Sequence, residues 1–485
     1  MSKKIIIEYF LLSIIFVFAF ILRLYKINIP LADHHSWRQA DTAAVARNFV
    51  KEGWDFLRPR IDNMTFLHSP DKPNKERLFL VEPPIYQTIV AGVYKVFGIK
   101  ESMARLVSIA FFLGSMIFLY LLARQYFGSG ISLLSAFFFA ILPYSIFYSR
   151  VILPEPMMIF LTMGLIYFLI KWLDKEKIIW WAIAVLFASL ALTQKIFPPF
   201  LVLPLAYLVL RKYSLNAFRQ PKIWLLVTLS LLPIVAWRVW ISQFPEGIPP
   251  SDWLLNQGAI RFKGAFFWWI FAERLGKLIL GHWGLIPFGL GLILIPGKKE
   301  GWFFHLWLLS TLIYVTIFAA GNVTHDYYQI PFIPITAIFL AKGSYWLLTA
   351  PRQIFNKAFC FLLSAFCFLF MLAFSWYQVR DFYNIQGGVD LAGQAVDKLT
   401  PKETLVLTGD SNDATLLYNT NRHGWTGGYA SYFPNTQETI EKIKKMGGSV
   451  YVTTKFEENS EFGKYMLQSY PVLKRTDQYI IFSLY

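Results

Sequence analysis

Long apolar runs recur along this chain of 485 residues, and they constrain its fold more than any other feature. A helix that crosses about 30 Å of hydrocarbon needs roughly 20 apolar residues. Candidate runs lie near 5–25, 102–123, 130–148, 153–172, 178–194, 196–210, 222–241, 278–296, 302–320, 329–348 and 357–377. The sequence therefore predicts a polytopic α-helical membrane protein with about eleven transmembrane helices, the first of them an uncleaved anchor.

Composition supports this class. Only 16% of the residues are charged and 56% are hydrophobic, which excludes a disordered chain, a coiled coil and an ordinary soluble enzyme. The net charge of +16 could indicate nucleic acid binding on a soluble surface. However, 35 of the basic and 18 of the acidic residues lie in the first 379 positions, where basic residues act as topology signals and contact lipid head groups. No nucleic acid partner is predicted.

Lys and Arg in alternate short loops predict the orientation, because translocation across the membrane disfavours them. With a cytoplasmic N-terminus, the inner loops carry Arg124; Lys171, Lys175 and Lys177; Arg211, Lys212, Arg219 and Lys222; Lys298 and Lys299; and Arg352 and Lys357. Six of the seven histidines then lie on or near the outer side, namely His34, His35, His68, His282, His325 and His423. We expect a multi-pass protein of the plasma or inner membrane, with any chemistry outside the cytoplasm.

Two outer segments are too long to be simple connections. The first outer loop, 26–101, contains an amphipathic pattern from Ser36 to Val50 and a second helix from Pro83 to Phe97, both predicted to lie along the membrane. The last hundred residues change character, with strands expected at 404–408, 449–454 and 479–484 and helices at 438–445 and 461–468. We therefore predict a membrane-embedded domain over 1–378 and a small α/β domain outside the cytoplasm over 379–485.

Ionisable groups near bilayer depth are expected to have a structural or functional role, because inserting each one costs roughly 2.5–3.5 kcal/mol. Asp33 follows the first apolar run, and a partly desolvated carboxylate can accept a proton from a hydroxyl. A helix cap or an ion pair with Arg38, Arg47 or Arg150 would equally explain its position. Glu155 begins the fourth run, where it could orient an acceptor in the same cavity or simply favour the positive end of the helix dipole.

Basic residues of the outer segments are candidates for binding phosphate, because Arg can hold two oxygens at once. Arg38, Lys75, Arg77 and Lys195 are in this group, although ordinary contacts with solvent or lipid would also explain them. Tyr327 and Tyr328 could bind a phosphate or a sugar, or form part of an interfacial aromatic belt. No metal site is predicted: His34 and His35 are adjacent, no HExxH is present, and both cysteines lie in one apolar run.

The order of these features resembles the glycosyltransferase C fold and, within it, the family of protein O-mannosyltransferases and lipid A aminoarabinose transferases. The resemblance rests on PLADHHSWRQADTA around Asp33, the Pro-Pro helix and following Arg-bearing helix over 82–128, LPEP at 153–156 and HDYYQIPFIP at 325–334. It covers roughly residues 5–350. It implies an integral-membrane transferase that moves a sugar from a polyprenyl-phosphate carrier to an acceptor on the outer side, with inversion and without a nucleotide or other cofactor, although a divalent cation is possible.

Residue roles follow from the resemblance. Asp33 matches the family's acidic catalytic residue and would be the general base, while Glu155 matches the second acidic position, where aspartate is common. Family members often carry a basic residue or His before the Pro-Pro, whereas this chain has Glu82. The resemblance thus implies that Tyr328, with Arg38, Arg77, Lys75 or Lys195, holds the donor phosphate. The residues expected around the sugar and the acceptor are His34, His35, His325, Tyr327 and Glu82.

Two other functions remain open at the level of sequence. A transporter or flippase of a lipid-linked saccharide would use a similar basic cavity, but such proteins commonly show repeats and broken helices, and neither is clear here. A scaffold whose outer domain binds a partner would leave Asp33 and Glu155 replaceable. The acceptor, whether a glycan, a lipid or a protein, is not specified by the sequence.

Overall fold

The computed structural model describes residues 3–65, 74–349, 356–411, 413–428 and 432–485. His68 and Arg352 lie outside these residues. The chain divides into two compact units. Unit 1 is Met1–Ile27, Ser108–Trp237 and Ser251–Asp381, and unit 2 is Asn28–Val107, Arg238–Pro250 and Phe382–Tyr485. Unit 2 thus groups the first outer loop with the C-terminal residues, and the predicted division at residue 378 stays a prediction.

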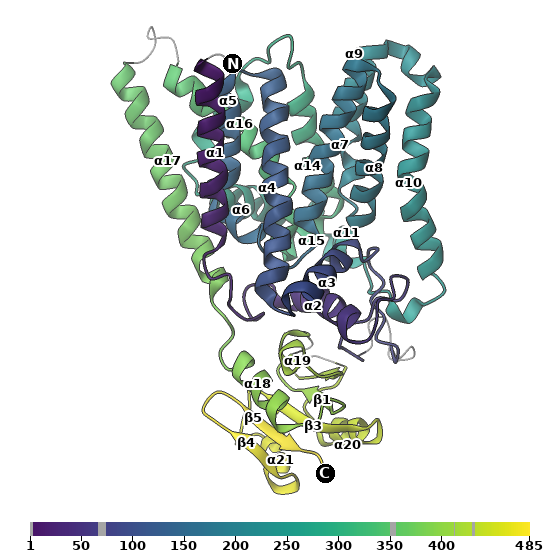
Figure 1. The fold of residues 1–485 in the computed structure, drawn as a ribbon. Helices are drawn as coiled ribbons and strands as arrows, with labels where there is room; N and C mark the ends of the chain where they lie inside the picture. Colours follow the sequence, from purple (N-terminus) through teal and green to yellow (C-terminus); the bar gives the residue numbers. More distant parts are fainter. Residues whose placement is uncertain (1–2, 66–73, 350–355, 412, 429–431) are drawn as a thin grey trace. The chain divides into compact units, whose positions relative to one another are not determined.

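Unit 1 is a bundle of apolar helices that run roughly side by side (Figure 1). Within the described residues, six helices of the chain are long and apolar enough to cross a membrane. They are α1 (Lys3–Arg23), α4 (Glu101–Tyr126), α7 (Glu155–Lys175), α10 (Pro221–Ile241), α16 (Phe332–Thr349) and α17 (Lys357–Val379). The predicted class of a polytopic helical membrane protein is confirmed, but the count of eleven spans is not.

The remaining apolar runs form shorter or interrupted helices. They give α5 (Ser129–Ile141), α6 (Pro143–Tyr148), α8 (Ile178–Gln194), α9 (Val202–Tyr213), α13 (Leu285–Ile293), α14 (Phe303–Ile317) and α15 (Ala319–Thr324). The predicted run 130–148 breaks at Leu142, whose ψ of 122° is extended because a following proline disfavours the helical conformation. A π-helix, η5 (Trp268–Ile279), precedes α13.

The C-terminal part of unit 2 holds a five-stranded sheet in the order β2-β1-β3-β5-β4. Its strands are β1 (Leu405–Thr408), β2 (Gly424–Thr426), β3 (Gly448–Thr453), β4 (Val472–Arg475) and β5 (Ile480–Ser483). β1 pairs in parallel with β2 and β3, whereas β5 is antiparallel to β3 and β4. The predicted small α/β domain is therefore confirmed.

Alternating side chains give this sheet two buried faces. Val406, Val450 and Val452 pack with residues of α18 (Val389–Leu399) and α19 (Thr415–Thr420). The intervening Leu407 and Tyr451 pack on the other face with α20 (Gln437–Lys445) and α21 (Glu461–Ser469). Successive side chains of a strand point to opposite faces, so both faces need apolar residues when helices cover both.

Two helices of the first outer loop, α2 (Ser36–Lys51) and α3 (Ile85–Phe97), lie within unit 2 close to their predicted bounds. The pattern of α2 predicted an amphipathic helix along the membrane, and that placement stays a prediction. In the structure α2 packs against both α3 and α19, and its polar residues Arg38, Gln39 and Arg47 are buried. These buried polar groups position the first half of the candidate site.

Candidate active site

Asp33 lies in the loop that follows α1, inside unit 2, and is only 3% exposed. Its Oδ1 accepts a hydrogen bond of 3.0 Å from the side-chain amide of Gln39, one turn into α2. Its Oδ2 lies 3.7 Å from a guanidinium nitrogen of Arg105, which is fully buried in the first turns of α4. The Arg105 charge favours the ionised carboxylate, and Gln39 fixes its orientation.

Sequence reasoning considered Arg38, Arg47 and Arg150 as partners of Asp33, and it missed Arg105. The signal was available, because an arginine in the first turns of an apolar helix is costly unless it is paired. The residue at the N-terminal cap of α2 is His35, and its side chain forms no cap hydrogen bond. Asp33 is thus held by an ion pair and an amide.

The backbone of 31–34 is tied to C-terminal residues of the same unit. Three hydrogen bonds do this: His34 N–H to the Phe382 carbonyl at 3.1 Å, Gln386 N–H to the Ala32 carbonyl at 2.8 Å, and the Asn419 amide to the Leu31 carbonyl at 2.8 Å. The His34 ring also stacks on Phe382, with centroids 3.8 Å apart. The C-terminal part of unit 2 therefore fixes the loop that carries Asp33.

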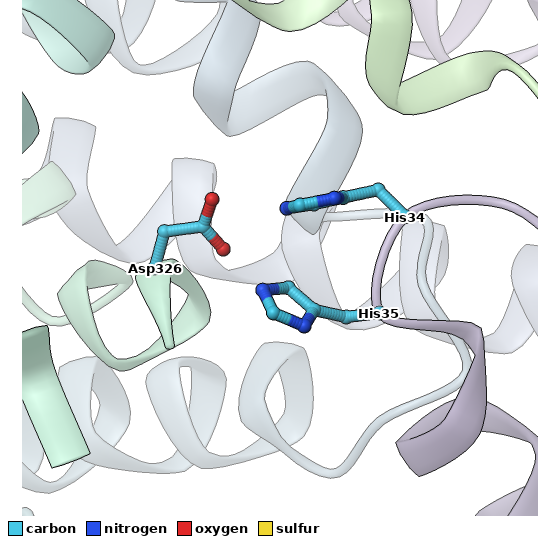
Figure 2. A group of neighbouring side chains, drawn as sticks. All are labelled: His34, His35 and Asp326. Carbon is cyan, nitrogen blue, oxygen red and sulfur yellow. The ribbon is translucent and has the colours of Figure 1, made fainter. Parts of the chain in front are cut away.

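His34 and His35 follow Asp33 directly in the sequence. Their ring centroids are 4.1 Å apart, and Figure 2 shows the two rings next to each other. His35 has a φ of 53°, an uncommon conformation for a residue with a side chain, and it turns the chain into α2. The roles predicted for both histidines at the sugar or acceptor stay predictions.

Two residues predicted to bind different parts of the substrate form a pair in unit 2. The guanidinium of Arg38 donates to Glu82 Oε1 at 2.7 Å, and both side chains are almost fully buried. Arg38 also lies over the ring of Phe79. The acidic residue before the Pro-Pro pair thus partners the arginine that sequence analysis placed on the phosphate.

Arg77 and Lys75 are differently placed. Lys75 is exposed, whereas Arg77 donates to Glu52 and lies within hydrogen-bonding distance of the His423 ring. Burial alone would raise the pKa of the Glu52 carboxyl, but His423 and Arg77 lower it to about 2. Arg77 therefore belongs to an ion network within unit 2, and its predicted contact with donor phosphate stays a prediction.

The same network contains Asp62 and His423. Burial opposes ionisation of Asp62, yet the adjacent Arg47 charge and the His423 hydrogen bond lower its pKa to about 2. Burial lowers the pKa of His423, but hydrogen bonds to Asp62 and Glu52 outweigh this effect and raise the pKa above its ordinary value. The network therefore joins the first outer loop to the C-terminal sheet through charged groups.

Asp41 lies one turn after Arg38 on α2 and is partly buried. Burial raises its pKa to about 7; Arg38 opposes the rise, and Asp62 and Asp413 add to it. A carboxyl with such a pKa is poised for proton transfer at physiological pH. Asp41 is not among the site residues predicted from the sequence.

Glu155 lies in unit 1 at the start of α7 and is 4% exposed. Its Oε1 is 3.2 Å from the ammonium of Lys195, so the predicted second carboxylate and one predicted phosphate ligand form an ion pair. Among the described residues, Glu155 Oε2 has no hydrogen-bond partner. Neither polar atom of the Gln194 amide has one either, although Gln194 is fully buried.

A second polar group of unit 1 surrounds Asp326 in η6 (Asp326–Gln329). Its carboxylate projects from this turn (Figure 2) and accepts a hydrogen bond from the Tyr148 hydroxyl. An Arg274 nitrogen lies 3.9 Å away, and Tyr144 donates to the Asp326 carbonyl at 2.6 Å. Asp326 is a buried carboxylate that sequence analysis did not select for the site.

The aromatic residues next to Asp326 are stacked. The His325 ring lies 5.4 Å from Tyr327 and 6.1 Å from Tyr328, both nearly parallel, and meets Trp253 edge-on at 5.5 Å. Tyr327 is buried, as expected for a structural member of the stack. Asp33 and Glu155 belong to different units, so the shared cavity expected from the sequence stays a prediction.

Comparisons with known proteins find a family model that matches part of the sequence and solved structures with a similar fold. Residues 81–240 match the family model described as dolichyl-phosphate-mannose-protein mannosyltransferase. Comparison with curated protein sequences gives no significant match. The matched segment includes the Pro-Pro helix with the following Arg-bearing helix and LPEP at 153–156, two of the features behind the resemblance, whereas Asp33 and 325–334 lie outside it.

Solved structures match nearly the whole chain. ArnT from Cupriavidus metallidurans, bound to undecaprenyl phosphate, is similar with a TM-score of 0.67 at 14% identity, covering 98% of each chain. Oligosaccharyltransferase from Archaeoglobus fulgidus matches at 0.56 and 12% identity, covering 95% of this chain and 71% of its own. Arabinofuranosyltransferase AftD from Mycobacteria matches at 0.60 and 12%, covering 100% of this chain and 42% of its own. The predicted resemblance in fold is confirmed.

Proposed function

We propose that this chain, which has the fold of the glycosyltransferase C membrane enzymes, transfers a sugar from a polyprenyl-phosphate carrier to an acceptor hydroxyl. The similarity to ArnT over 98% of both chains and the match to the mannosyltransferase family model support this reaction class. The acceptor can be a glycan, a lipid or a protein. The observation that carries the catalytic assignment is the buried carboxylate of Asp33, oriented by Gln39 and charged beside Arg105.

In this proposal Asp33 is the general base. An ionised carboxylate offers about four acceptor positions, so the Gln39 bond leaves capacity for a proton from the acceptor hydroxyl. Arg105 keeps Asp33 ionised before the reaction and lowers its intrinsic basicity. The acceptor oxygen then attacks the sugar carbon as the carbon–oxygen bond to the phosphate breaks, which inverts the configuration in a single displacement.

The leaving group needs positive charge rather than a strong acid, because polyprenyl phosphate is a stabilised anion. Lys195 has three donors, so it can contact the phosphate while it keeps its bond to Glu155. Arg38, with five donors, can do the same beside Glu82. Tyr328 would add a hydroxyl donor. We propose that these groups serve without a resident metal or cofactor, and full transfer after treatment with a chelator is the expected result.

The remaining assignments also belong to this proposal. Glu155, His34, His35, His325, Tyr327 and Glu82 would orient the sugar and the acceptor, and Arg77 or Lys75 would assist with the phosphate. The active side would be extracytoplasmic, with the N-terminus in the cytoplasm and the protein in the plasma or inner membrane. Labelling of an introduced cysteine near Asp477 from outside intact cells is the expected outcome, and labelling only from the cytoplasm would reverse the orientation.

The decisive experiment is a transfer assay of the purified full chain in nanodiscs with a panel of polyprenyl-phosphate sugars. General-base catalysis contributes about 10²- to 10⁴-fold, so we expect Asp33→Asn to lower kcat by at least about a hundredfold. Glu155→Gln should lower it by about tenfold, as expected for a group that orients a substrate. Nuclear magnetic resonance of the product should show the inverted anomer.

Controls separate chemistry from folding. Asp477→Asn in unit 2 and Asp252→Asn in unit 1 change exposed carboxylates outside the assigned residues and should leave transfer unchanged. Asp41→Asn tests the carboxyl of α2 whose pKa burial raises to about 7. Full activity in both Asp33→Asn and Glu155→Gln would overturn the assignment. Movement of a lipid-linked saccharide across the membrane, without transfer of any sugar, would favour a transporter instead.

A further inference from the structure

A polar cavity of about 350 Å³ lies in unit 1, where the C-terminal ends of α4, α7 and α9 meet the loop before α14. These ends lie at the same end of the bundle as the N-terminus (Figure 1). The charged and amide groups that line the cavity are Lys171, Asp174, Arg211, Lys212, Lys299 and Gln125. Four cations and one carboxylate give a formal charge of +3 around the space.

The wall of the cavity is built by specific contacts. The Arg211 guanidinium donates to the backbone carbonyls of Lys298 and Lys299 at 3.0 and 2.9 Å, which fastens the loop to the end of α9. Tyr207 on α9 accepts a hydrogen bond from the Trp302 backbone at 3.1 Å. Gly301 has a φ of 53°, and a Cβ there would lie 2.0 Å from the Tyr207 hydroxyl. This glycine permits the close approach that holds Lys299 at the cavity.

Neutralisation of helix dipoles explains only part of this arrangement. Cations stabilise the negative C-terminal end of a helix, which accounts for Arg211 and Lys212 in the last turn of α9. Lys212 also pairs with Glu176 at 3.1 Å. Lys299 lies in a loop, however, and no helix ends at its position. Dipole neutralisation also leaves a hollow of this volume unexplained.

Gln125, near the end of α4, adds a side-chain amide to the lining of the cavity. A cavity of about 150 Å³ holds a benzene molecule, so this one has room for a phosphate group and its first substituents.

We propose that this cavity binds a phosphate group, with Lys171 and Lys299 as its ligands, supplied by the head group of an anionic phospholipid. Lys171, Arg211, Lys212 and Lys299 all lie in segments that the charge pattern assigns to the cytoplasmic side, where anionic lipids attract basic pockets between helices. The site is separate from the residues assigned to sugar transfer, and the inference does not depend on that function.

The test is native mass spectrometry of the full chain released from nanodiscs of phosphatidylcholine with or without phosphatidylglycerol. The wild type should retain phosphatidylglycerol in preference to phosphatidylcholine. The double variant Lys171→Gln and Lys299→Gln should reduce this retention by about tenfold, because each lysine near an anionic head group contributes to binding. The matched control, Lys175→Gln with Lys298→Gln, removes two cations from the same segments that do not line the cavity, and it should retain the lipid like the wild type.

A second arm distinguishes a lipid from a soluble source. Inorganic phosphate is titrated into the wild type in phosphatidylcholine nanodiscs, with thermal stability as the readout. Stabilisation by phosphate without lipid retention supports the phosphate site and assigns it to a soluble anion. Equal lipid retention by the cavity variant and its control, with no stabilisation by phosphate, would overturn the proposal. Lipid retention and stabilisation by phosphate are both measured on the wild type as well, so a variant that misfolds does not decide the result.

Discussion

The two units use their buried charges differently. Unit 2 buries arginine–carboxylate pairs, including Arg105 with Asp33 and Arg47 with Asp62, in which both side chains are less than a tenth exposed. Unit 1 has a comparably buried pair in which the cation is a lysine, Lys342 with Glu300. Arginine stays charged and holds a fixed planar geometry, whereas lysine is flexible and can move its charge toward water. Removal of a buried cation should therefore lower the stability of unit 2 more than that of unit 1.

The largest effect is expected for Arg105→Met in unit 2. The substitution removes the Arg105 charge from beside the buried Asp33 carboxylate, and breaking a buried pair costs about 3–5 kcal/mol. Transfer should fall with stability, because the candidate base is then neutralised or displaced. Thermal unfolding is measured with protease cleavage sites in each unit as the readout. This measurement would show whether only unit 2 is destabilised.

A double variant sharpens this prediction. Arg105→Met with Asp33→Asn removes both charges and should be more stable than Arg105→Met alone, although it remains inactive. Equal stability of the single and double variants would show that the two charges do not interact, and the basis for the catalytic assignment of Asp33 would then be lost.

Unit 1 offers the matching test at smaller magnitude. Lys342→Met leaves Glu300 buried and should destabilise unit 1 by about 2 kcal/mol, less than the arginine case because polar contacts in membrane helices are often weaker. The protease pattern of unit 2 should not change. If Lys342→Met loosens both units equally, the division into two units with separate charge clusters is wrong.

This contrast also explains which parts of the molecule could be predicted from sequence. The bounds of α2, α3, β1, β3 and β5 follow from local apolar periodicity, and the structure has them within a few residues. Pairings between distant residues leave no periodic signal. Asn419 binds the carbonyl of Leu31 across 388 positions, and the three residues of β2 become a strand only by pairing with β1.

The candidate site shows the same limit. Asp33, Glu155 and Lys195 could be selected because charge at the end of an apolar run is costly. The Lys195–Glu155 pair forms only when the end of α8 packs near the start of α7, and the Arg38–Glu82 pair forms only when α2 packs near the segment before α3, so neither pair leaves a local signal in the sequence. Sequence analysis therefore found many of the charged groups but treated cations and carboxylates as independent ligands, where the structure joins them.

A smaller effect is expected from pH through His423. Its folded-state pKa is raised, so its contribution is fully present below the ordinary value of 6.5 and is lost as the pH rises through the folded value. The contributions of Glu52 and Asp62 are present above 4.5 and 3.8 and are lost as the pH falls toward 2. The network should therefore stabilise unit 2 most between these ranges.

His423→Gln tests this window. The wild type should lose about 1 kcal/mol of unit 2 stability between slightly acidic and alkaline pH, a value reduced for the partial exposure of the ring. The variant should show little change over that range. Thermal unfolding at pH 5.5 and 8.5, both values in the same detergent, measures the difference. An equal loss in the variant would assign the pH response to another group.

The smallest effect is expected where a charge pair of unit 2 is exposed. Arg475 and Glu458 are close enough for an ion pair, but each side chain is about half exposed. Water screens such a pair, so Glu458→Gln should change stability by less than about 0.5 kcal/mol. This variant tests whether the loss of stability comes from breaking any arginine pair or only from breaking a buried one. A loss as large as that of Arg105→Met would mean that pairing geometry, rather than burial, makes the charges of unit 2 sensitive to substitution.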